Sequence, residues 1–379
     1  MGHPWHTGMK ILVCPLDWGL GHAARCVPVI RQFRARGHDV VLGGYGRSLE
    51  FLIREFPDLE RLNFPGISVQ YPAGKRFAFF YVYKIFGFLR QIVREHHRLR
   101  KLVLAHRFEM VVSDGRVGLF TRLCPSVLIT HQLFVKFPRW EVADVSWGRW
   151  LETVFFWFFR PLLRRYNQVW VPDFATPSGL TGELSHRRTS LKNIRFIGPL
   201  CRFSPLPRPD KPTPAVDRLA LVSGPEPQRT MFERTLKTIL RDLPGRNLML
   251  LGKPEEAQAG GPGLRLDDCQ NGLCQLPHAD EETMSRLMQA AGLIITRPGY
   301  TTIMELAGLG IKNVLFVPTP GQTEQEYLAR CLEKQKIAPW RDQSRLSPDD
   351  FRPEAACYRG FGDLLRQTDL GGRVPIQVP

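Results

Sequence analysis

Three side chains that can accept a proton stand where an apolar, strand-like run ends. His22 lies in the turn GLGHAAR at the start of an expected helix, Asp114 ends the run VVSD, and His131 ends the run LITH. A helix N-terminus lowers the basicity of a histidine, so His22 can stay neutral and accept a proton. Asp114 and His131 are rival bases. His22 and Asp114 also have structural alternatives, in which they only cap a helix or bond a loop.

The opening turn also carries Gly19 and Gly21. Glycine allows the backbone to approach a ligand closely. A dinucleotide-binding loop would read G-x-G-x-x-G, and the third glycine is missing here. The turn therefore favours close approach to a different ligand, with an imidazole beside it.

A second polar group follows two apolar runs in the other half of the chain. Arg297 and Gly299 come after the run LIIT, and Thr301 or Thr302 is expected to cap a helix that carries Glu305 one turn in. Free N–H groups at a helix start attract phosphate, and a carboxylate one turn in can accept hydrogen bonds from two sugar hydroxyls. The same spacing also fits a capped helix without a ligand. After the run NVLFVP, a loop offers further hydroxyl-binding side chains: Gln322, Thr323, Glu324 and Gln325.

These residues need a scaffold of parallel strands. Short apolar runs alternate with helical stretches, and the alternation restarts after residues 204–217, which hold five prolines in fourteen positions. Such a proline-rich stretch is typical of an extended linker. We therefore predict an α/β fold with two Rossmann-like doubly wound domains, at 9–203 and 218–379, joined by the linker. Ligands of such sheets bind at the carboxyl ends of the strands, in the cleft.

The charge of the chain is unevenly placed. Its net charge is +16, and residues 1–205 hold 30 Lys and Arg against 14 Asp and Glu, whereas residues 206–379 hold 22 of each. A basic surface attracts the phosphates of nucleic acid or anionic lipid, although some basic proteins are simply soluble. No RNA- or DNA-binding motif accompanies the charge.

The cysteines and the hydropathy pattern indicate a cytoplasmic protein. The eight cysteines are scattered without a CxxC pair, so reduced thiols are expected rather than a zinc site or a disulfide framework. The first residues contain no apolar signal-peptide core. No apolar run reaches the roughly 18 residues that a transmembrane helix needs.

Two stretches combine aromatic and basic residues, at 76–90 and 147–170. That combination suits the interface of a membrane. The alternative is an ordinary core helix, since aromatic side chains usually pack in cores.

The segment 293–329 strongly resembles the donor-binding half of family 28 glycosyltransferases. That family includes the enzyme that adds N-acetylglucosamine to form lipid II and the diacylglycerol sugar transferases. Its pattern Arg-Ser-Gly-x-x-Thr-x-x-Glu is matched by RPGYTTIME, with proline in place of serine, and is followed by FVP and by Gln325-Glu326. The resemblance implies that Glu305 holds the ribose of a UDP-sugar, and that Gln325 reads the sugar hydroxyls.

The other landmarks of the family follow from the same resemblance. The stretch LVSGPEPQRTMFE takes the place of the diphosphate-binding loop, and the stretch before the signature would meet the uracil near His278. The resemblance also implies that Gly19, Gly21 and His22 face the diphosphate and the acceptor. The diphosphate loop contributes the candidates Ser223, Gly224, Gln228 and Arg229.

The resemblance implies a GT-B glycosyltransferase that moves a hexose or N-acetylhexosamine from a UDP-sugar to an acceptor hydroxyl, without a metal or other cofactor. A lipid-linked acceptor would place the protein peripherally on the inner face of the cell membrane, with an anionic membrane surface as its partner. Two alternatives stay open: a UDP-sugar 2-epimerase of the same fold, and a basic nucleic-acid-binding protein.

Overall fold

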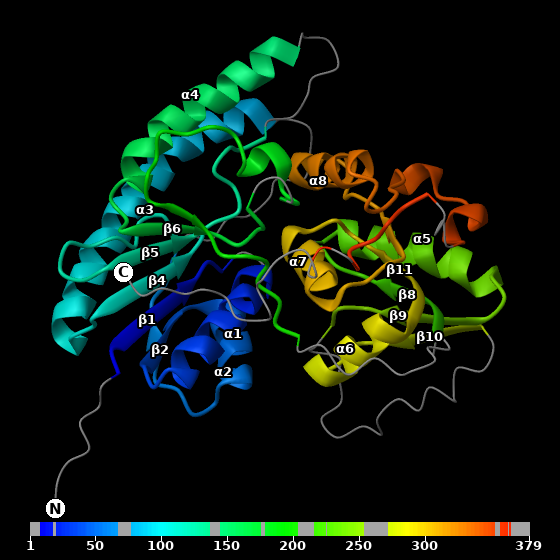
Figure 1. The fold of residues 1–379 in the computed structure, drawn as a ribbon, viewed down its shortest axis with the longest axis horizontal. Helices are drawn as coiled ribbons and strands as arrows, with labels where there is room; N and C mark the ends of the chain where they lie inside the picture. The colour runs from blue at the N-terminus through cyan, green and yellow to red at the C-terminus, as the bar shows by residue number, and fades with distance from the viewer. Residues whose placement is uncertain are drawn as a thin grey trace, which may run out of the picture.

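The computed structural model describes residues 8–17, 20–66, 77–136, 145–175, 179–203, 216–224, 226–253, 272–352, 357–362 and 364. These residues form two parallel β-sheets flanked by helices, one in each half of the chain (Figure 1). The predicted α/β class with two doubly wound, Rossmann-like units is therefore confirmed.

The first sheet has the strand order β3-β2-β1-β4-β5-β6-β7, and each neighbouring pair is parallel. The chain runs outward from β1 to β3 and then returns to place β4 on the other side of β1. Ligands of such sheets bind at this reversal of strand order, beside the carboxyl ends of β1 and β4. The strands are β1 (Lys10–Pro15), β2 (Asp39–Gly44), β3 (Arg61–Asn63), β4 (Met110–Asp114), β5 (Ser126–Ile129), β6 (Gln168–Val171) and β7 (Ile194–Phe196).

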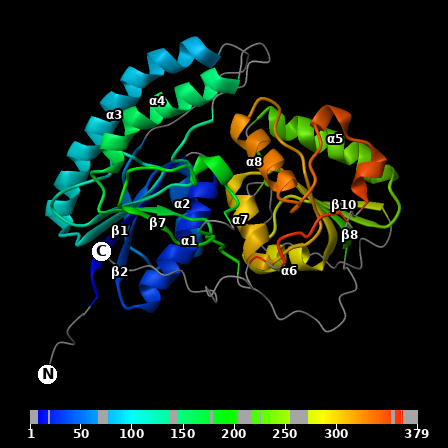
Figure 2. The same ribbon diagram turned by 45° about the horizontal axis from the view of Figure 1, so that its top comes forward.

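Helices cover both faces of this sheet because its strands are apolar on both sides. In β1, Ile11 and Val13 pack with residues of α1 (Leu20–Ala35), whereas Leu12 and Cys14 pack with residues of α3 (Phe77–His106). Helix α2 (Gly46–Glu55) joins α1, and α4 (Val145–Leu163) lies beside α3 in both ribbon views (Figures 1 and 2). None of the helices among the described residues is long and apolar enough to cross a membrane.

The second sheet has the order β10-β9-β8-β11-β12 and is also parallel. Helix α5 packs on one face through Phe232, Leu236 and Leu240, whereas α6, α7 and α8 pack on the other. The strands are β8 (Val216–Leu221), β9 (Arg246–Leu250), β10 (Gly272–Leu276), β11 (Ala291–Thr296) and β12 (Val314–Phe316). The helices are α5 (Gln228–Asp242), α6 (Glu281–Ala290), α7 (Tyr300–Leu309) and α8 (Thr323–Lys334).

The structure differs from the sequence-based expectation at three points. Neither Thr301 nor Thr302 caps a helix, because α7 already begins at Tyr300 and Gly299 is its N-cap. Strand β8 begins at Val216, so the last two residues of the predicted linker are in the sheet, and 204–215 lie outside the described residues. Cys274 takes part in a disulfide, so the expectation of only reduced thiols is wrong there.

The two halves meet where α1 faces α7 (Figure 2). The Thr301 hydroxyl donates a 3.2 Å hydrogen bond to the carbonyl oxygen of Gly21. A Cβ atom on residue 21 would lie only 2.8 Å from that Thr301 oxygen. Gly21 therefore leaves room for the Thr301 side chain from the other half of the protein. From the sequence, this glycine is instead expected to allow close approach to an acceptor.

This contact predicts a coupling between the two positions. Gly21→Ala should lower the free energy of unfolding in the wild-type background, because the new methyl group forces Thr301 away from its bond. In a Thr301→Ala background the same change should be neutral or stabilising, since alanine favours helix over glycine by up to about 1 kcal/mol. Denaturant unfolding of the four variants measures the cycle, and purely additive effects would contradict the prediction.

Candidate active site

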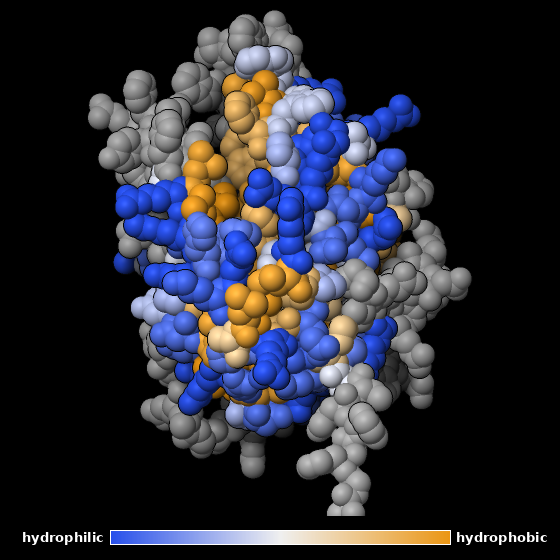
Figure 3. All heavy atoms as spheres, turned by 90° about the vertical axis from the view of Figure 1, so that its left-hand side faces the viewer, coloured by the Kyte–Doolittle hydropathy of each residue, from blue (hydrophilic) through white to orange (hydrophobic). Residues whose placement is uncertain are grey.

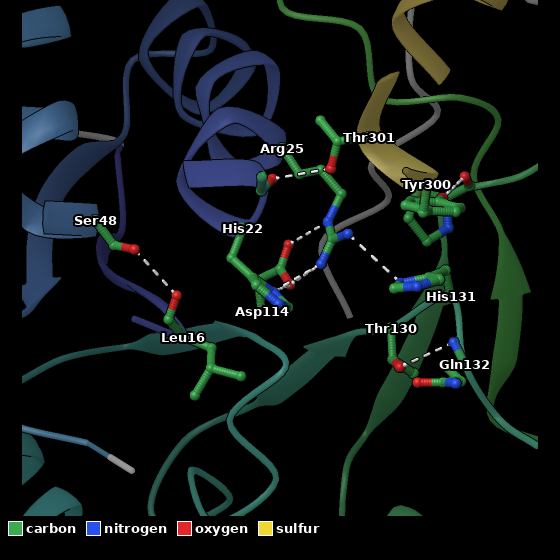
Figure 4. Close-up of polar contacts among 12 residues, drawn as sticks. Leu16, His22, Arg25, Ser48, Asp114, Thr130, His131, Gln132, Tyr300 and Thr301 are labelled. Carbon is green, nitrogen blue, oxygen red and sulfur yellow. Dashed lines mark hydrogen bonds and ion pairs between the residues drawn. The ribbon is translucent and has the colours of Figure 1, made fainter. Parts of the chain in front are cut away.

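His22 and Asp114 come together at the reversal of strand order in the first sheet (Figure 4). Asp114 is the last residue of β4, and His22 lies in the first turn of α1, which follows β1. The Nδ1 atom of His22 is 2.6 Å from the Oδ1 atom of Asp114. The two rival bases of the sequence analysis therefore form one histidine–aspartate pair, in which the carboxylate is buried and the imidazole remains partly exposed.

Arg25 holds the carboxylate of this pair from the other side. Its Nε atom donates to Asp114 Oδ2 at 2.9 Å and its Nη2 atom donates to Asp114 Oδ1 at 2.6 Å. Such a two-point guanidinium–carboxylate pair fixes geometry as well as charge. Sequence reasoning missed Arg25. The only signal was its position three residues after His22, which places both side chains on one face of a helix.

Burial and the charges in this cluster favour a neutral imidazole at His22 and an ionised carboxylate at Asp114. Burial and the Arg25 guanidinium lower the pKa of His22 below its ordinary value, and Asp114 only partly offsets them. Burial alone would raise the pKa of Asp114, but Arg25 and His22 outweigh it and hold that pKa well below its ordinary value. A neutral histidine with an ionised partner is suited to accepting a proton and stabilising the resulting cation.

Gly115 provides the space for the His22 ring. Its φ angle is +71°, in the left-handed region that favours glycine, and a Cβ atom there would lie 2.8 Å from His22 Cε1. The end of β4 therefore positions the Asp114 carboxylate, and the glycine that follows it leaves space for the His22 imidazole.

His131 connects this pair to the second half of the chain. Its ring stacks on Tyr300 of α7 with 3.8 Å between centroids, and its Nε2 atom lies 2.9 Å from Glu324 Oε1 of α8. The Tyr300 hydroxyl in turn donates to the carbonyl oxygen of Pro172. Burial would raise the pKa of Glu324, but His131 and the nearby cations lower it overall. His131, which the sequence predicts as a rival base, thus binds Glu324, which the sequence predicts as a hydroxyl-binding side chain.

The carboxylate of Glu305, the carboxamide of Gln325 and the neighbouring carboxylate of Glu326 all accept hydrogen bonds from within the protein. Glu305 accepts a 2.8 Å bond from Arg202 Nε, and burial raises its pKa although Arg202 counteracts this. Gln325 accepts a 2.8 Å bond from the backbone N–H of Thr319, and Glu326 accepts one from Gly321. Any ligand that uses these groups must exchange such bonds for its own.

Arg297 is buried and holds the loop after β12. Its Nη1 atom donates to the carbonyl oxygens of Val317 and Pro318, at 2.9 and 2.7 Å, and its guanidinium lies over the Phe232 ring. Burial lowers its pKa to about 9. Its side chain therefore positions the loop that leads to α8, where Thr323 donates to the carbonyl oxygen of Lys136 at 3.1 Å.

Part of the loop after β8 is exposed to solvent. Ser223 and Gly224 are exposed, and Gly224 has a φ angle of +119°. Arg229 donates to the carbonyl oxygen of Leu251 at 3.0 Å and to Glu226, so it tightens the start of α5. His278 is exposed after β10, and Gly19 lies outside the described residues.

Three buried polar atoms around the carboxyl edge of the second sheet have no hydrogen-bond partner among the described residues. They are Gln228 Oε1 at the start of α5, Arg297 Nε after β11 and Thr319 Oγ1 after β12. Burying such atoms without partners is costly. They lie at the edge where parallel sheets bind ligands. The described residues contain no cluster of three or more His, Cys, Asp or Glu with the geometry of a metal site.

Comparisons with known proteins agree with this architecture. Residues 277–352 match the family described as glycosyltransferase family 28 C-terminal domain. An uncharacterized glycosyltransferase of Methanosarcina acetivorans is 23% identical over 343 residues, which cover 86% of this chain and 84% of that protein.

Solved glycosyltransferases share the two-domain arrangement. The glycotransferase of kitacinnamycin has a TM-score of 0.60 at 18% identity and covers 95% of this chain and 94% of its own. MurG of Acinetobacter baumannii has a TM-score of 0.51 at 16% identity, with 95% and 90% covered. LpCGTa, solved in complex with UDP, has a TM-score of 0.55 at 14% identity, with 93% and 92% covered. The chain therefore has the GT-B fold, and its resemblance to family 28 is confirmed over the matched segment.

The buried pair predicts a pH-dependent stability. Asp114→Asn should lower the free energy of unfolding by about 3–5 kcal/mol at neutral pH, because it leaves the Arg25 charge buried without its carboxylate. Since folding depresses the pKa of Asp114, its contribution is present above the unfolded value of about 3.9 and is lost as pH falls below it. The difference from wild type should therefore narrow below about pH 4.

Denaturant unfolding at pH 7, 5, 4 and 3 measures this difference. Asp58→Asn is the matched control, because Asp58 forms an exposed pair with Arg34 at 2.6 Å and such pairs contribute about 1 kcal/mol or less. If Asp114→Asn lowers the free energy of unfolding no more than Asp58→Asn does, Asp114 does not form a stabilising buried ion pair with Arg25.

Proposed function

We propose that the protein is a glycosyltransferase that moves a hexose or N-acetylhexosamine from a UDP-sugar to an acceptor hydroxyl, with His22 as the base. The observation that carries the proposal is the His22–Asp114 pair at the carboxyl edge of the first sheet, opposite α7 and α8 of the second. The GT-B fold and the family match on the second half support the reaction class.

The proposed chemistry is a direct displacement. The acceptor hydroxyl gives its proton to the Nε2 atom of His22, and its oxygen bonds to the anomeric carbon of the sugar while the bond from that carbon to the diphosphate oxygen breaks. Asp114 stabilises the imidazolium that forms, because its carboxylate lies 2.6 Å from Nδ1. UDP leaves with the electron pair, and the N–H groups at the starts of α5 and α7 face its negative charge.

The donor site is proposed at the carboxyl edge of the second sheet. The unpartnered Thr319 hydroxyl would donate there to a diphosphate oxygen, and the unpartnered Gln228 Oε1 would accept from a hydroxyl or N–H group of the nucleotide. Glu305 would exchange Arg202 for the ribose hydroxyls, and Gln322 to Gln325 start the helix beside the sugar. That one structural neighbour was solved in complex with UDP supports a uridine nucleotide as the donor carrier.

Thr319→Val gives a direct test of the donor site. The Thr319 hydroxyl makes no hydrogen bond among the described residues, so its replacement by a methyl group should leave the melting temperature of the free protein unchanged or raised. The variant should nevertheless bind UDP about tenfold or more weakly, because a hydrogen bond to a charged ligand contributes roughly 1.5–3 kcal/mol. Thermal-shift titration with UDP measures both quantities.

Thr121→Val is the control for this variant. Thr121 is also buried, but its hydroxyl oxygen accepts a 3.2 Å bond from the N–H of Leu123 in the first half of the chain. The control should lose stability and keep its affinity for UDP. If UDP at millimolar concentration shifts no melting temperature, the donor assignment fails.

The role of His22 predicts a split between binding and turnover. His22→Ala should lower kcat by about 10²–10⁴-fold, because general-base catalysis contributes that range, while the dissociation constant for UDP stays near the wild-type value. UDP release from a panel of UDP-hexoses and UDP-N-acetylhexosamines, with diacylglycerol vesicles as the acceptor, measures kcat. Wild-type turnover that persists in His22→Ala would remove His22 from the base role.

The acceptor is proposed to be lipid-linked and reached at the inner face of the cell membrane. Exposed apolar side chains of α3 and α4 support this, and Figure 3 shows apolar atoms among hydrophilic ones over the upper part of that face. Trp157 is 58% exposed and Phe158 is 79% exposed on α4, where Arg149 is 60% exposed. Anionic headgroups attract such cations at about 1 kcal/mol each, and aromatic rings enter the interface.

Liposome co-sedimentation tests this membrane surface. Wild type should sediment with vesicles that contain anionic lipid at low salt and be released at high salt, since salt screens the attraction. Trp157→Ser with Phe158→Ser should reduce sedimentation, whereas Met231→Ser, which removes a 49% exposed side chain on α5, should not. Equal recovery of the protein in the supernatant under all conditions would contradict the membrane surface, and the proposed acceptor would then be a soluble molecule.

A further inference from the structure

Arg25 makes more charged and aromatic contacts than any side chain of the pair it supports. Besides its two bonds to Asp114, its Nη2 atom lies 2.7 Å from His22 Nδ1 and its Nη1 atom lies 3.4 Å from His131 Nδ1. Nη2 gives its hydrogen to Asp114 Oδ1 and not to His22, because His22 Nδ1 must carry a hydrogen of its own for Asp114 if Nε2 is to accept a proton. Its guanidinium carbon lies 5.1 Å from the centre of the Tyr300 ring. The side chain is only 3% exposed, so these contacts define its position.

The chemistry of these partners fixes the direction of a chain of hydrogen bonds. A guanidinium only donates, so His131 Nδ1 must be the acceptor in its contact with Arg25. With Nδ1 accepting, the hydrogen of the ring lies on Nε2, which donates to Glu324 Oε1 at 2.9 Å. Figure 4 shows Arg25 between Asp114 on one side and His131 on the other.

We propose that Arg25 is the positioning residue of the His22–Asp114 pair, and that through His131 it ties this pair to Glu324 in the first turn of α8. This inference rests on the proposed function for its meaning in catalysis. His22 would then be correctly oriented only when α8 contacts His131. The contact between the two halves of the chain and the orientation of the base would therefore be coupled.

The charges that face His22 support this role. They come from Asp114 on β4, Arg25 on α1, His131 after β5 and, further away, Glu324 on α8. Burial lowers the pKa of His22 most, and Arg25 lowers it next, against Asp114. Loss of the Arg25 charge should therefore raise the pKa of His22 and protonate the base at a higher pH.

The test is a histidine NMR titration, which needs neither donor nor acceptor. Arg25→Gln should raise the pKa of His22 by about one unit or more, as expected for removal of a neighbouring charge. Arg25→Lys keeps the charge without the two-point geometry, so the pKa should stay near wild type while kcat falls at least tenfold. His22→Gln assigns the signal. Nitrogen-15 shifts should show His131 protonated on Nε2 in wild type, and this preference should weaken in Arg25→Gln.

Arg31→Gln is the matched control, because Arg31 is a further cation of α1 that binds the other half of the chain, through Glu281 at 2.8 Å. It should leave the His22 titration unchanged. An identical His22 titration in wild type, Arg25→Gln and Arg31→Gln would overturn the proposal. If Arg25→Gln does not fold, unchanged kcat in Arg25→Lys overturns it instead. Absence of turnover in wild type with every donor would refute the proposed function, while the NMR result still decides the positioning role.

Discussion

The ion pair between Asp114 and Arg25 is the contact on which the rest of the site depends. The Asp114 carboxylate has no exposed surface, and a buried charge is stable only when an opposite charge compensates it. Arg25 compensates it through two hydrogen bonds. Burial and the Arg25 guanidinium lower the pKa of the neighbouring His22, whereas Asp114 opposes them and orients the imidazole through Nδ1. The ion pair can form because the strand order reverses at β1, which brings the end of β4 beside the start of α1. The topology of the sheet therefore places the residues of the site.

The two halves of the chain are joined by residues that belong to the site. Thr301 bonds the backbone of Gly21, His131 bonds Glu324, and Arg202 bonds Glu305. A ligand in this cleft would replace protein–protein bonds with protein–ligand bonds. The buried atoms without hydrogen-bond partners at the carboxyl edge of the second sheet lie where we propose the donor site.

Much of the scaffold followed from the sequence, because short apolar runs between helices have few other folds available. The partners of the site residues did not follow, since they depend on contacts across the chain. Arg25 looked like one basic residue among many, and its pairing with Asp114 joins positions 89 apart in the sequence. Similarly, the signature arginine Arg297 was predicted to face the donor, but its side chain turns inward to two carbonyl oxygens. Strand β3 is only three residues long, and neither it nor helix α2 was predicted.

A structure of the protein with UDP bound would test the central claim most directly. The account predicts that the diphosphate lies at the carboxyl edge of the second sheet, within hydrogen-bond reach of the Thr319 hydroxyl and the Gln228 side chain. The uridine ribose should meet Glu305 in place of Arg202, and the open end of the diphosphate should point toward His22. UDP bound elsewhere on the protein, or at this edge with its diphosphate turned away from His22, would contradict the account.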